Sequence, residues 1–488
     1  MIHRNIGSLF LLSLALALPA SAQRGTSGGS LPAGDSTWTF DLARWNTIIG
    51  SAFTEARGYD VLGRMCDEAG GRLAGTPANE QALRILEEEL RALGLTPRRE
   101  RHAIPGFRRG DDVVEVRAPF TRRLRAVALG YTDATPSFDA SLLYVRQGYE
   151  DQYNGVNAAG RVVLVTQEAA KGREELLRYE AIEIAARQGA RAILFIDTRG
   201  GGRTLVGMTN FEGRPSAIPA YSITLEEGSW LRRLTERGTP VAMRIDTRSR
   251  VEPIEIDNII VTLPGRTTEK IVIGAHSDAW DVGQGGSDNG LGTAVLVDVA
   301  RMLARHAPAN ERTIECVWFN AEEIGLWGAR RYWEAHKGEP IVAMLNMDMP
   351  GSVRGINAMG YDDVLPFLRA VAAELPGFDL KWGVSNHAWT NSDHMPFMLG
   401  GVPTFNLMTE IEGDGAKYYH DFGDTFEKVN RKHLSEAAAL MSILTIEMAA
   451  RPTLPLRRRS EAQTIDMLRA AKLDVRLKKQ GEWPFDAE

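Results

Sequence analysis

The chain has 488 residues, 44% of them hydrophobic and 25% charged, which is the composition of a soluble globular protein. A chain of this length has more residues than one hydrophobic core usually organises, so we expect a large domain and a smaller one. The formal net charge is −6, and no basic block is long enough to line a nucleic-acid groove. Nucleic acid is therefore excluded as an expected partner.

The N-terminus has the pattern of a secretory signal peptide. Arg4 supplies a positive charge, residues 9–18 form an apolar run too short to span a bilayer, and the Ala-Ser-Ala triplet at 20–22 offers a cleavage site. An N-terminal anchor is the alternative. No later segment is apolar for long enough to be a membrane span. We predict a signal peptide over residues 1–22 and export to the periplasm or the extracellular space.

The first strong element after a Gly- and Ser-rich leader is a helix over residues 79–95, NEQALRILEEELRALGL, whose leucines lie near one face. Cys66 precedes it in a helix-like segment, and Cys316 lies far downstream in an apolar, strand-like run. An exported protein could join two cysteines. We predict two buried free thiols instead, because Cys is among the most often buried residue types.

Residues 120–252 form a second compositional unit. Strand-like pieces such as ASLLYV and RVVLVTQ alternate with a helix, ELLRYEAIEIAARQGA, and no catalytic residue types cluster there. We expect a small α/β insert that covers or binds rather than reacts. It interrupts a larger domain made of residues 23–119 and 253–455, and a charged tail over 456–488 follows.

From Asn258 onward, buried apolar strands alternate with amphipathic helices. This pattern predicts an α/β fold with a mixed, mostly parallel central sheet and helices on both faces. In such sheets the chemistry lies at the carboxyl ends of the strands. The expected strands are IIVTLPG, KIVIGAH, TIECVWFN, VAMLNMDM and VPTFNLM, and the expected helices are LGTAVLVDVARMLARH, VLPFLRAVAAEL and HLSEAAALMSILTIEMAA.

The glycine-rich stretch IVIGAHSDAWDVGQGGSDNG, residues 271–290, allows three interpretations. A dinucleotide cradle needs G-x-G-x-x-G, but Asp288 stands where the third glycine should be and would repel a pyrophosphate. A nucleophile elbow needs G-x-S-x-G, and Asn289 spoils that match. A metal site needs His and carboxylates. His276 and Asp278 lie two apart on the same side of an extended segment, and Asp288 adds a carboxylate.

Further candidates follow the next predicted strands, namely Glu322-Glu323, Asp348 and His420. Any one of them alone is more often a solvated loop residue. Their common position at strand ends favours a site, and zinc takes this set of His and carboxylate ligands. In an extended stretch the side chains of the adjacent glutamates point opposite ways, so one can bind metal while the other faces the substrate as a general base.

These segments resemble a known family. HSDAWDVGQGGSDNG, WFNAEEIGLWGARRY, LNMDM and YHDFGDT are similar to the signature of the di-zinc aminopeptidase and glutamate carboxypeptidase superfamily. The resemblance covers residues 50–450, and residues 120–252 look like the protease-associated domain that many members contain. A zinc exopeptidase fold, two zinc ions per chain and a homodimer are what the resemblance implies.

The resemblance also implies a role for each matching residue. His276 and Asp348 would hold one zinc ion, Glu323 and His420 the other, and Asp288 would bridge both, with a cis peptide bond to Asn289. Asp278 would orient His276, and Glu322 would act as general base while a hydroxide shared by the zinc ions attacks the peptide carbonyl. Tyr419 matches the tyrosine that stabilises the oxyanion, although Tyr418 competes for that role.

Substrate and reaction class are less constrained. Glutamate-specific members hold the acidic side chain with arginines after the last strand, and PTFNLMTE has none. We therefore expect dipeptides or short peptides with a free N-terminus, with residues 391–394, Asn-Ser-Asp-His, as pocket candidates. Two alternatives remain: a single-zinc acyltransferase of the glutaminyl cyclase type, and a receptor-like binding protein of the same fold. Their zinc content, one ion or none, distinguishes them from a di-zinc hydrolase.

Overall fold

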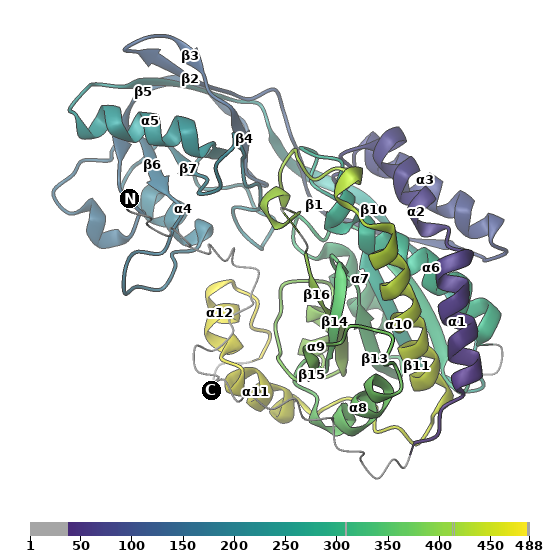
Figure 1. The fold of residues 1–488 in the computed structure, drawn as a ribbon. Helices are drawn as coiled ribbons and strands as arrows, with labels where there is room; N and C mark the ends of the chain where they lie inside the picture. Colours follow the sequence, from purple (N-terminus) through teal and green to yellow (C-terminus); the bar gives the residue numbers. More distant parts are fainter. Residues whose placement is uncertain (1–37, 308–309, 412, 414, 486–488) are drawn as a thin grey trace, which may run out of the picture.

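The computed structural model describes residues 38–307, 310–411, 413 and 415–485. The predicted signal peptide and the leader after it lie outside these residues. Within the described part, the chain folds around two sheets of eight strands each. Figure 1 shows the first sheet and its helices on one side of the molecule and the second sheet, residues 113–247, on the other. No helix in this described part is long and apolar enough to cross a membrane.

The first sheet is mixed. Its strand order is β1-β10-β12-β11-β13-β16-β14-β15. The pairings β12–β11, β11–β13 and β13–β16 are parallel, whereas β1, β10 and β14 pair antiparallel with their inner neighbours. The strands are β1 (Arg98–Arg108), β10 (Arg250–Leu263), β11 (Lys270–His276), β12 (Thr313–Phe319), β13 (Ile341–Asn346), β14 (Ser352–Asn357), β15 (Gly383–Ser385) and β16 (Thr404–Glu410).

Alternate residues of the central strands pack on opposite faces of this sheet. Ile271 and Ile273 of β11 belong to a large core with α1, α3, α6, α8 and α10, while Val272 packs with α7 and α9 on the other face. The predicted fold class, an α/β sheet with helices on both faces, is confirmed. The helices are α1 (Leu42–Thr54), α2 (Gly58–Arg64), α3 (Pro77–Ala92), α6 (Leu291–His306), α7 (Trp327–His336), α8 (Leu365–Ala373), α9 (Met395–Leu399) and α10 (Arg431–Ala450).

The second sheet has the order β3-β2-β9-β5-β6-β7-β8-β4 and carries one helix on each face. Leu231 of α5 packs on one side and Ala181 and Ile182 of α4 on the other. These elements are β2 (Val113–Ala118), β3 (Arg122–Arg123), β4 (Ala126–Ala128), β5 (Thr135–Tyr144), β6 (Val162–Thr166), α4 (Arg178–Arg187), β7 (Ala192–Ile196), β8 (Ala220–Ile223), α5 (Leu225–Glu236) and β9 (Ala242–Thr247). We call residues 113–247 the insert.

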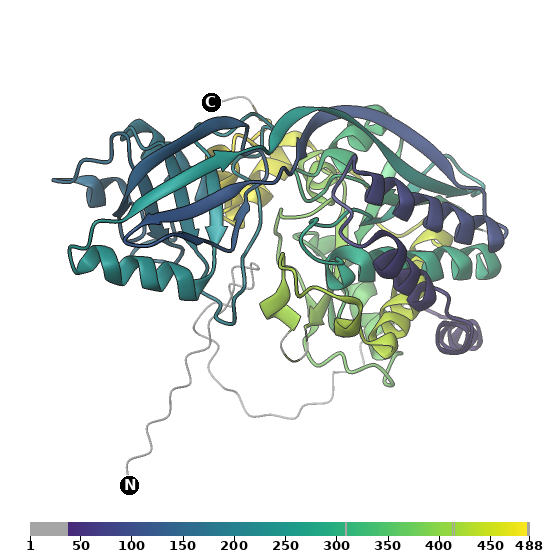
Figure 2. The ribbon, with the colours of Figure 1, turned by 90° about the horizontal axis from the view of Figure 1, so that it is seen from above.

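The insert is connected to the first sheet by one long antiparallel ribbon. β1 and β10 pair from Arg98 opposite Ile260 to Arg108 opposite Arg250, so the chain leaves and re-enters at paired positions. Figure 2 shows the two strands running together along the top of the molecule. The predicted boundary at residue 120 stays a prediction, although the pairing of β2 with β9 places residues 113–118 on the second sheet.

Two helices form in the C-terminal segment over residues 456–485. They are α11 (Glu461–Ala470) and α12 (Leu473–Lys479), and Leu468 and Leu477 are buried against Met359 and Met395 of the larger domain. Cys66 and Cys316 are buried and unbonded, as the sequence predicted.

Candidate metal centre

The candidate ligands lie at one edge of the first sheet, where its parallel strands end. β11 ends at His276, Glu322 and Glu323 follow β12, and Asp348 follows β13. His420 lies in the loop after β16. Because β12, β11, β13 and β16 are parallel neighbours, their carboxyl ends bring these side chains together.

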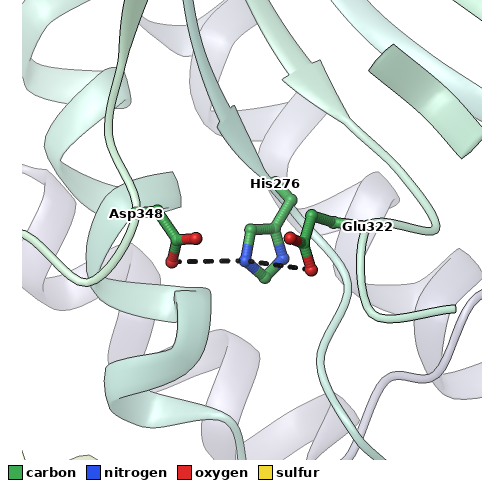
Figure 3. Close-up of side chains that lie close together, drawn as sticks. All are labelled: His276, Glu322 and Asp348. Carbon is green, nitrogen blue, oxygen red and sulfur yellow. Dashed lines mark ion pairs between the residues drawn. The ribbon is translucent and has the colours of Figure 1, made fainter. Parts of the chain in front are cut away.

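The first cluster surrounds the imidazole of His276. Its Nε2 lies 3.3 Å from Asp288 Oδ1, 3.5 Å from Asp348 Oδ1 and 3.9 Å from Glu322 Oε2. Figure 3 shows Asp348 and Glu322 reaching the ring from opposite sides. Glu322 is the most distant of these three carboxylates, and the ligand atoms of His276, Glu322 and Asp348 all lie within 4.8 Å of one another.

The second cluster surrounds His420. Its Nε2 lies 2.9 Å from Glu323 Oε2 and 3.0 Å from Asp288 Oδ2. Asp288 therefore turns one oxygen toward each imidazole. The adjacent glutamates also separate, because Glu322 reaches the His276 cluster and Glu323 reaches the His420 cluster.

Backbone carbonyls fix the tautomers of both imidazoles. His276 Nδ1 lies 3.2 Å from the carbonyl oxygen of Asp278, and His420 Nδ1 lies 3.2 Å from that of Val206. A carbonyl can only accept, so Nδ1 is the donor in each contact and the Nε2 of each ring faces the carboxylates. This is the usual arrangement of a metal-ligating histidine.

Asp278 holds the glutamate pair as well as facing His276. Its carboxylate accepts the backbone N–H of Glu322 at 3.0 Å and of Glu323 at 3.3 Å. Asp278 Oδ1 lies 3.6 Å from His276 Nδ1, farther than the Asp278 carbonyl oxygen. The expected role of orienting His276 is therefore shared with the backbone of Asp278 itself.

The carboxylates of the two clusters outnumber the imidazoles that could balance their negative charge, and the pKa values of several of these groups are shifted. Burial raises the pKa of Glu323 to about 7, with His420 opposing and Asp288 adding to the shift. For Asp288, burial favours the neutral acid, but His276 and His420 outweigh it and hold its pKa below the usual range. Burial opposes the charged form of His420, yet Glu323 and Asp288 raise its pKa to about 10.

These residues fit bound cations. Among the described residues, His276 Nε2 and Glu323 Oε1 are buried and make no hydrogen bond. The ion pairs of Asp288, Glu322, Glu323 and Asp348 within the described part all run to the two imidazoles. Buried carboxylates need a compensating charge, and a divalent ion among imidazole nitrogens and carboxylate oxygens supplies one.

The glycine-rich loop that carries Asp288 is held by two residues to which the sequence assigned no role. Arg72 is fully buried and donates to the carbonyls of Ser277, Gln284 and Gly285 at 2.8, 2.6 and 2.8 Å. Asp424 accepts the N–H of Ser287 at 2.8 Å and of Asp288 at 3.0 Å.

Backbone geometry and tight packing also fix this loop. Gly285 has φ +59°, and an added Cβ would lie 2.2 Å from the Cβ of Ala279. The Asp288–Asn289 peptide bond is cis, as the resemblance implied. The glycines therefore serve close packing around the carboxylate.

Tyr419 and Tyr418 point to different surroundings. The ring of Tyr419 stacks on that of His420 with centroids 3.7 Å apart. The pKa of the Tyr419 hydroxyl is raised well above its usual value, mainly by burial and to a lesser extent by the negative charges of Asp288 and Glu323. The ring of Tyr418 instead contacts Arg203 and Lys428. Of the two tyrosines, Tyr419 is therefore the one that stacks on the candidate ligand His420.

The candidate pocket residues 391–394 lie beside the same cluster. Asp393 is fully buried, and neither carboxylate oxygen has a hydrogen-bond partner within the described chain. Burial raises its pKa well above the usual range, with His276 opposing and Asp278 adding to the shift. Ser392 accepts a hydrogen bond from Asn346 at 2.9 Å, and His394 donates to the Trp389 carbonyl at 2.7 Å.

Comparisons with known proteins agree with the fold and with a zinc metallopeptidase. Residues 258–445 match the model of peptidase family M28. Carboxypeptidase Q of Mus musculus is 26% identical over 410 residues, which cover 80% of this chain and 86% of that protein. Aminopeptidase YwaD of Bacillus subtilis is 25% identical over 441 residues, covering 86% and 91%.

A solved structure shows the same fold. The crystal structure of a peptidase M28 precursor from Shewanella amazonensis superposes with a TM-score of 0.75 at 24% identity, covering 86% of this chain and 99% of that one.

A mixed α/β sheet whose parallel strands end in two groups of His and carboxylate ligands defines a metallopeptidase. Over residues 258–445 the chain is similar to peptidase family M28. The segment WDVGQG and residues 58–82 also resemble carboxypeptidase Q.

Proposed function

We propose that this zinc metallopeptidase is a di-zinc exopeptidase that hydrolyses dipeptides or short peptides with a free N-terminus. The proposal rests on the position of Asp288, whose two carboxylate oxygens face different imidazoles. Oδ1 faces His276 Nε2 at 3.3 Å and Oδ2 faces His420 Nε2 at 3.0 Å. One carboxylate between two imidazoles, each with further carboxylates of its own, supports a bridged pair of ions rather than one.

The ligand sets follow from the two clusters. His276 and Asp348 would hold one ion, Glu323 and His420 the other, and Asp288 both. Zinc bound there would lower the pKa of a water molecule and polarise the scissile carbonyl. The chain's own residues would carry the proton.

Glu322 is placed to act as general base. Its backbone N–H is fixed by Asp278, and its side chain reaches the site from the side opposite Asp348 (Figure 3). Glu322 takes a proton from the attacking water as the carbonyl carbon gains its new C–O bond. It then gives the proton to the amine as the C–N bond breaks. The Tyr419 hydroxyl would donate to the carbonyl oxygen as that oxygen becomes negative.

Two asparagines beside Asp348 offer polar groups to a substrate. Together with Trp389, Asn346 and Asn406 line a small recess next to Asp348. The Oδ1 atoms of both asparagines are buried without a hydrogen-bond partner in the described chain, so they are available to accept hydrogen bonds from an amino group. These acceptors support a substrate with a free amine.

Basic residues near the end of β16 do not favour an acidic substrate. Arg354 donates to Glu410 at 2.7 Å, and Lys381 donates to the same carboxylate at 3.0 Å. Their charge is compensated within the chain. A strict requirement for a C-terminal glutamate is therefore not part of the proposal.

Export, a homodimer and the protease-associated character of the insert complete the proposal, and each rests on the sequence. The signal peptide pattern lies in residues 1–22, outside the described part.

Zinc content and substrate preference test the proposed function together. Purified protein should contain about two zinc ions per chain, cleave free di- and tripeptides, and lose activity with a chelator. N-acetylated peptides should resist cleavage. One zinc ion with cyclase activity would favour the acyltransferase, and no zinc with no cleavage would favour a binding protein. Equal cleavage of acetylated and free peptides would refute the free-amine requirement.

A further inference from the structure

The insert contacts the candidate metal centre through the loop that follows β7, residues 197–206. Val206 pairs with His420 in both directions. Its N–H donates to the His420 carbonyl at 3.0 Å, and its carbonyl accepts from His420 Nδ1 at 3.2 Å. One residue of the insert thus fixes both the backbone and the ring of a candidate ligand.

A buried arginine of the same loop holds the residues that precede His420. The side chain of Arg199 is 7% exposed and pairs with Asp197 at 2.8 Å. Its Nη1 donates to the carbonyls of Lys417 at 3.1 Å and Tyr419 at 2.7 Å. On the other side of His420, the N–H of Thr204 donates to Asp421 Oδ2 at 2.8 Å. The insert therefore contacts the segment 417–421 before, at and after His420.

This segment needs such support. His420 has φ +50°, in the left-handed region that non-glycine residues rarely adopt. In the described chain, the hydrogen bonds that the backbone carbonyls of Tyr419 and His420 make outside their own loop run to the insert. Nothing equivalent applies to His276, which ends a central strand and donates to the carbonyl of its neighbour Asp278.

We propose that the insert is a positioning element for the ion held by His420, Glu323 and Asp288, and that Arg199 is its key side chain. The inference rests on the proposed function, since it requires that these residues bind a metal ion. Arg199 touches neither ion nor substrate. It holds the carbonyls on either side of Tyr418, and Val206 then keeps the His420 ring in the tautomer whose Nε2 faces the carboxylates. The ion held by His276 and Asp348 does not depend on the insert.

The test measures the two metal affinities separately. Metal-free protein is titrated with zinc against a chromophoric chelator, and His420→Ala, which should keep one ion, identifies the His276 site. In Arg199→Ala we expect one dissociation constant to rise roughly 10- to 100-fold, the usual effect of losing a group that orients a ligand, while the other stays unchanged. Arg199→Lys should be intermediate, because a single ammonium keeps the charge beside Asp197 but cannot pair with Asp197 and also donate to both carbonyls as the guanidinium does.

Arg312 offers a matched control far from the site. It is also buried, pairs with Glu269 at 2.8 Å and donates to the carbonyls of Met448 and Arg451. Arg312→Ala should lower the unfolding temperature and leave both dissociation constants unchanged. If Arg199→Ala leaves both constants at the wild-type value, or raises both equally, the inference is wrong.

A measurement on the wild-type protein guards against a variant that does not fold. Long-range ¹H–¹⁵N spectra of the zinc-loaded protein should show His420 protonated at Nδ1, identified by the signal that His420→Ala loses. An unprotonated Nδ1 would overturn the inference even if two ions bind. A wild-type chain that binds fewer than two ions would instead refute the proposed function itself.

Discussion

Replacing Glu322 by glutamine tests the general base with little change of shape. Glutamine fills the same volume but cannot take a proton. Glu322 Oε2 is also the carboxylate oxygen farthest from His276 Nε2, at 3.9 Å against 3.3 and 3.5 Å for Asp288 and Asp348. Both ions should therefore stay bound while kcat falls by roughly 10²–10⁴. This loss corresponds to about 2.7–5.5 kcal/mol of transition-state stabilisation.

The same substitution should stabilise the metal-free protein. Without metal, burial raises the pKa of Glu322 well above 4.5, with His276 opposing and Asp348 and Asp393 adding to the shift. An acid whose pKa is raised by folding binds more protons in the folded state, so its contribution to stability is present at low pH and falls as pH rises above about 4.5. Glutamine removes that loss. Metal-free Glu322→Gln should therefore unfold at a higher temperature than metal-free wild type at pH 8, and the difference should shrink near pH 4.

Three measurements decide the assignment: zinc per chain, kcat on a free dipeptide, and thermal unfolding of the metal-free forms at both pH values. Glu322→Asp serves as the matched control, because it keeps a base but shortens its reach, and it should retain part of the activity. Near-wild-type activity in Glu322→Gln would refute the base assignment. Loss of a zinc ion would show that Glu322 is a ligand instead.

Two further substitutions test how the ligands are held. Asp288→Asn should weaken both ions, because the amide offers one oxygen where the carboxylate offers two; metal analysis that still finds two tightly bound ions would contradict the bridge. Arg72→Met should lower the unfolding free energy by at least about 3 kcal/mol, since three buried carbonyls each lose a donor worth about 1 kcal/mol. Denaturant unfolding measures this change, and a loss below about 1 kcal/mol would mean that water replaces the guanidinium.

The parts of the fold that the sequence predicts well are those with an apolar pattern. β11, β12 and β13 are buried along almost their whole length, so each is a largely apolar run that ends at or near a candidate ligand. β1 was not expected, because RRERHAIPGFR is mostly charged. It is an edge strand and exposes several of its arginines.

Some residues of the candidate site could likewise be predicted from the sequence, and others could not. His276, Asp288, Glu323 and His420 could be selected from the sequence, because side-chain chemistry and position at strand ends coincide. Arg72 and Val206 could not be selected. Arg72 donates to the carbonyl of Ser277, 205 positions away, and Val206 uses its own carbonyl to accept from the His420 ring, 214 positions away. Such contacts leave no residue type or spacing that marks them in a single sequence.

The paired strands β1 and β10 bring the two ends of the insert together at the edge of the first sheet. These ends are already side by side at Arg108 and Arg250, so a change in the length of the insert costs only loop-closure entropy, about 0.6 kcal/mol for each doubling. Elements remote from the metal centre, such as the β2–β3 hairpin, can be lengthened or replaced on this basis. A foreign domain grafted at the same two positions would keep the first sheet intact. It would support His420 only if it brought its own equivalent of the loop 197–206.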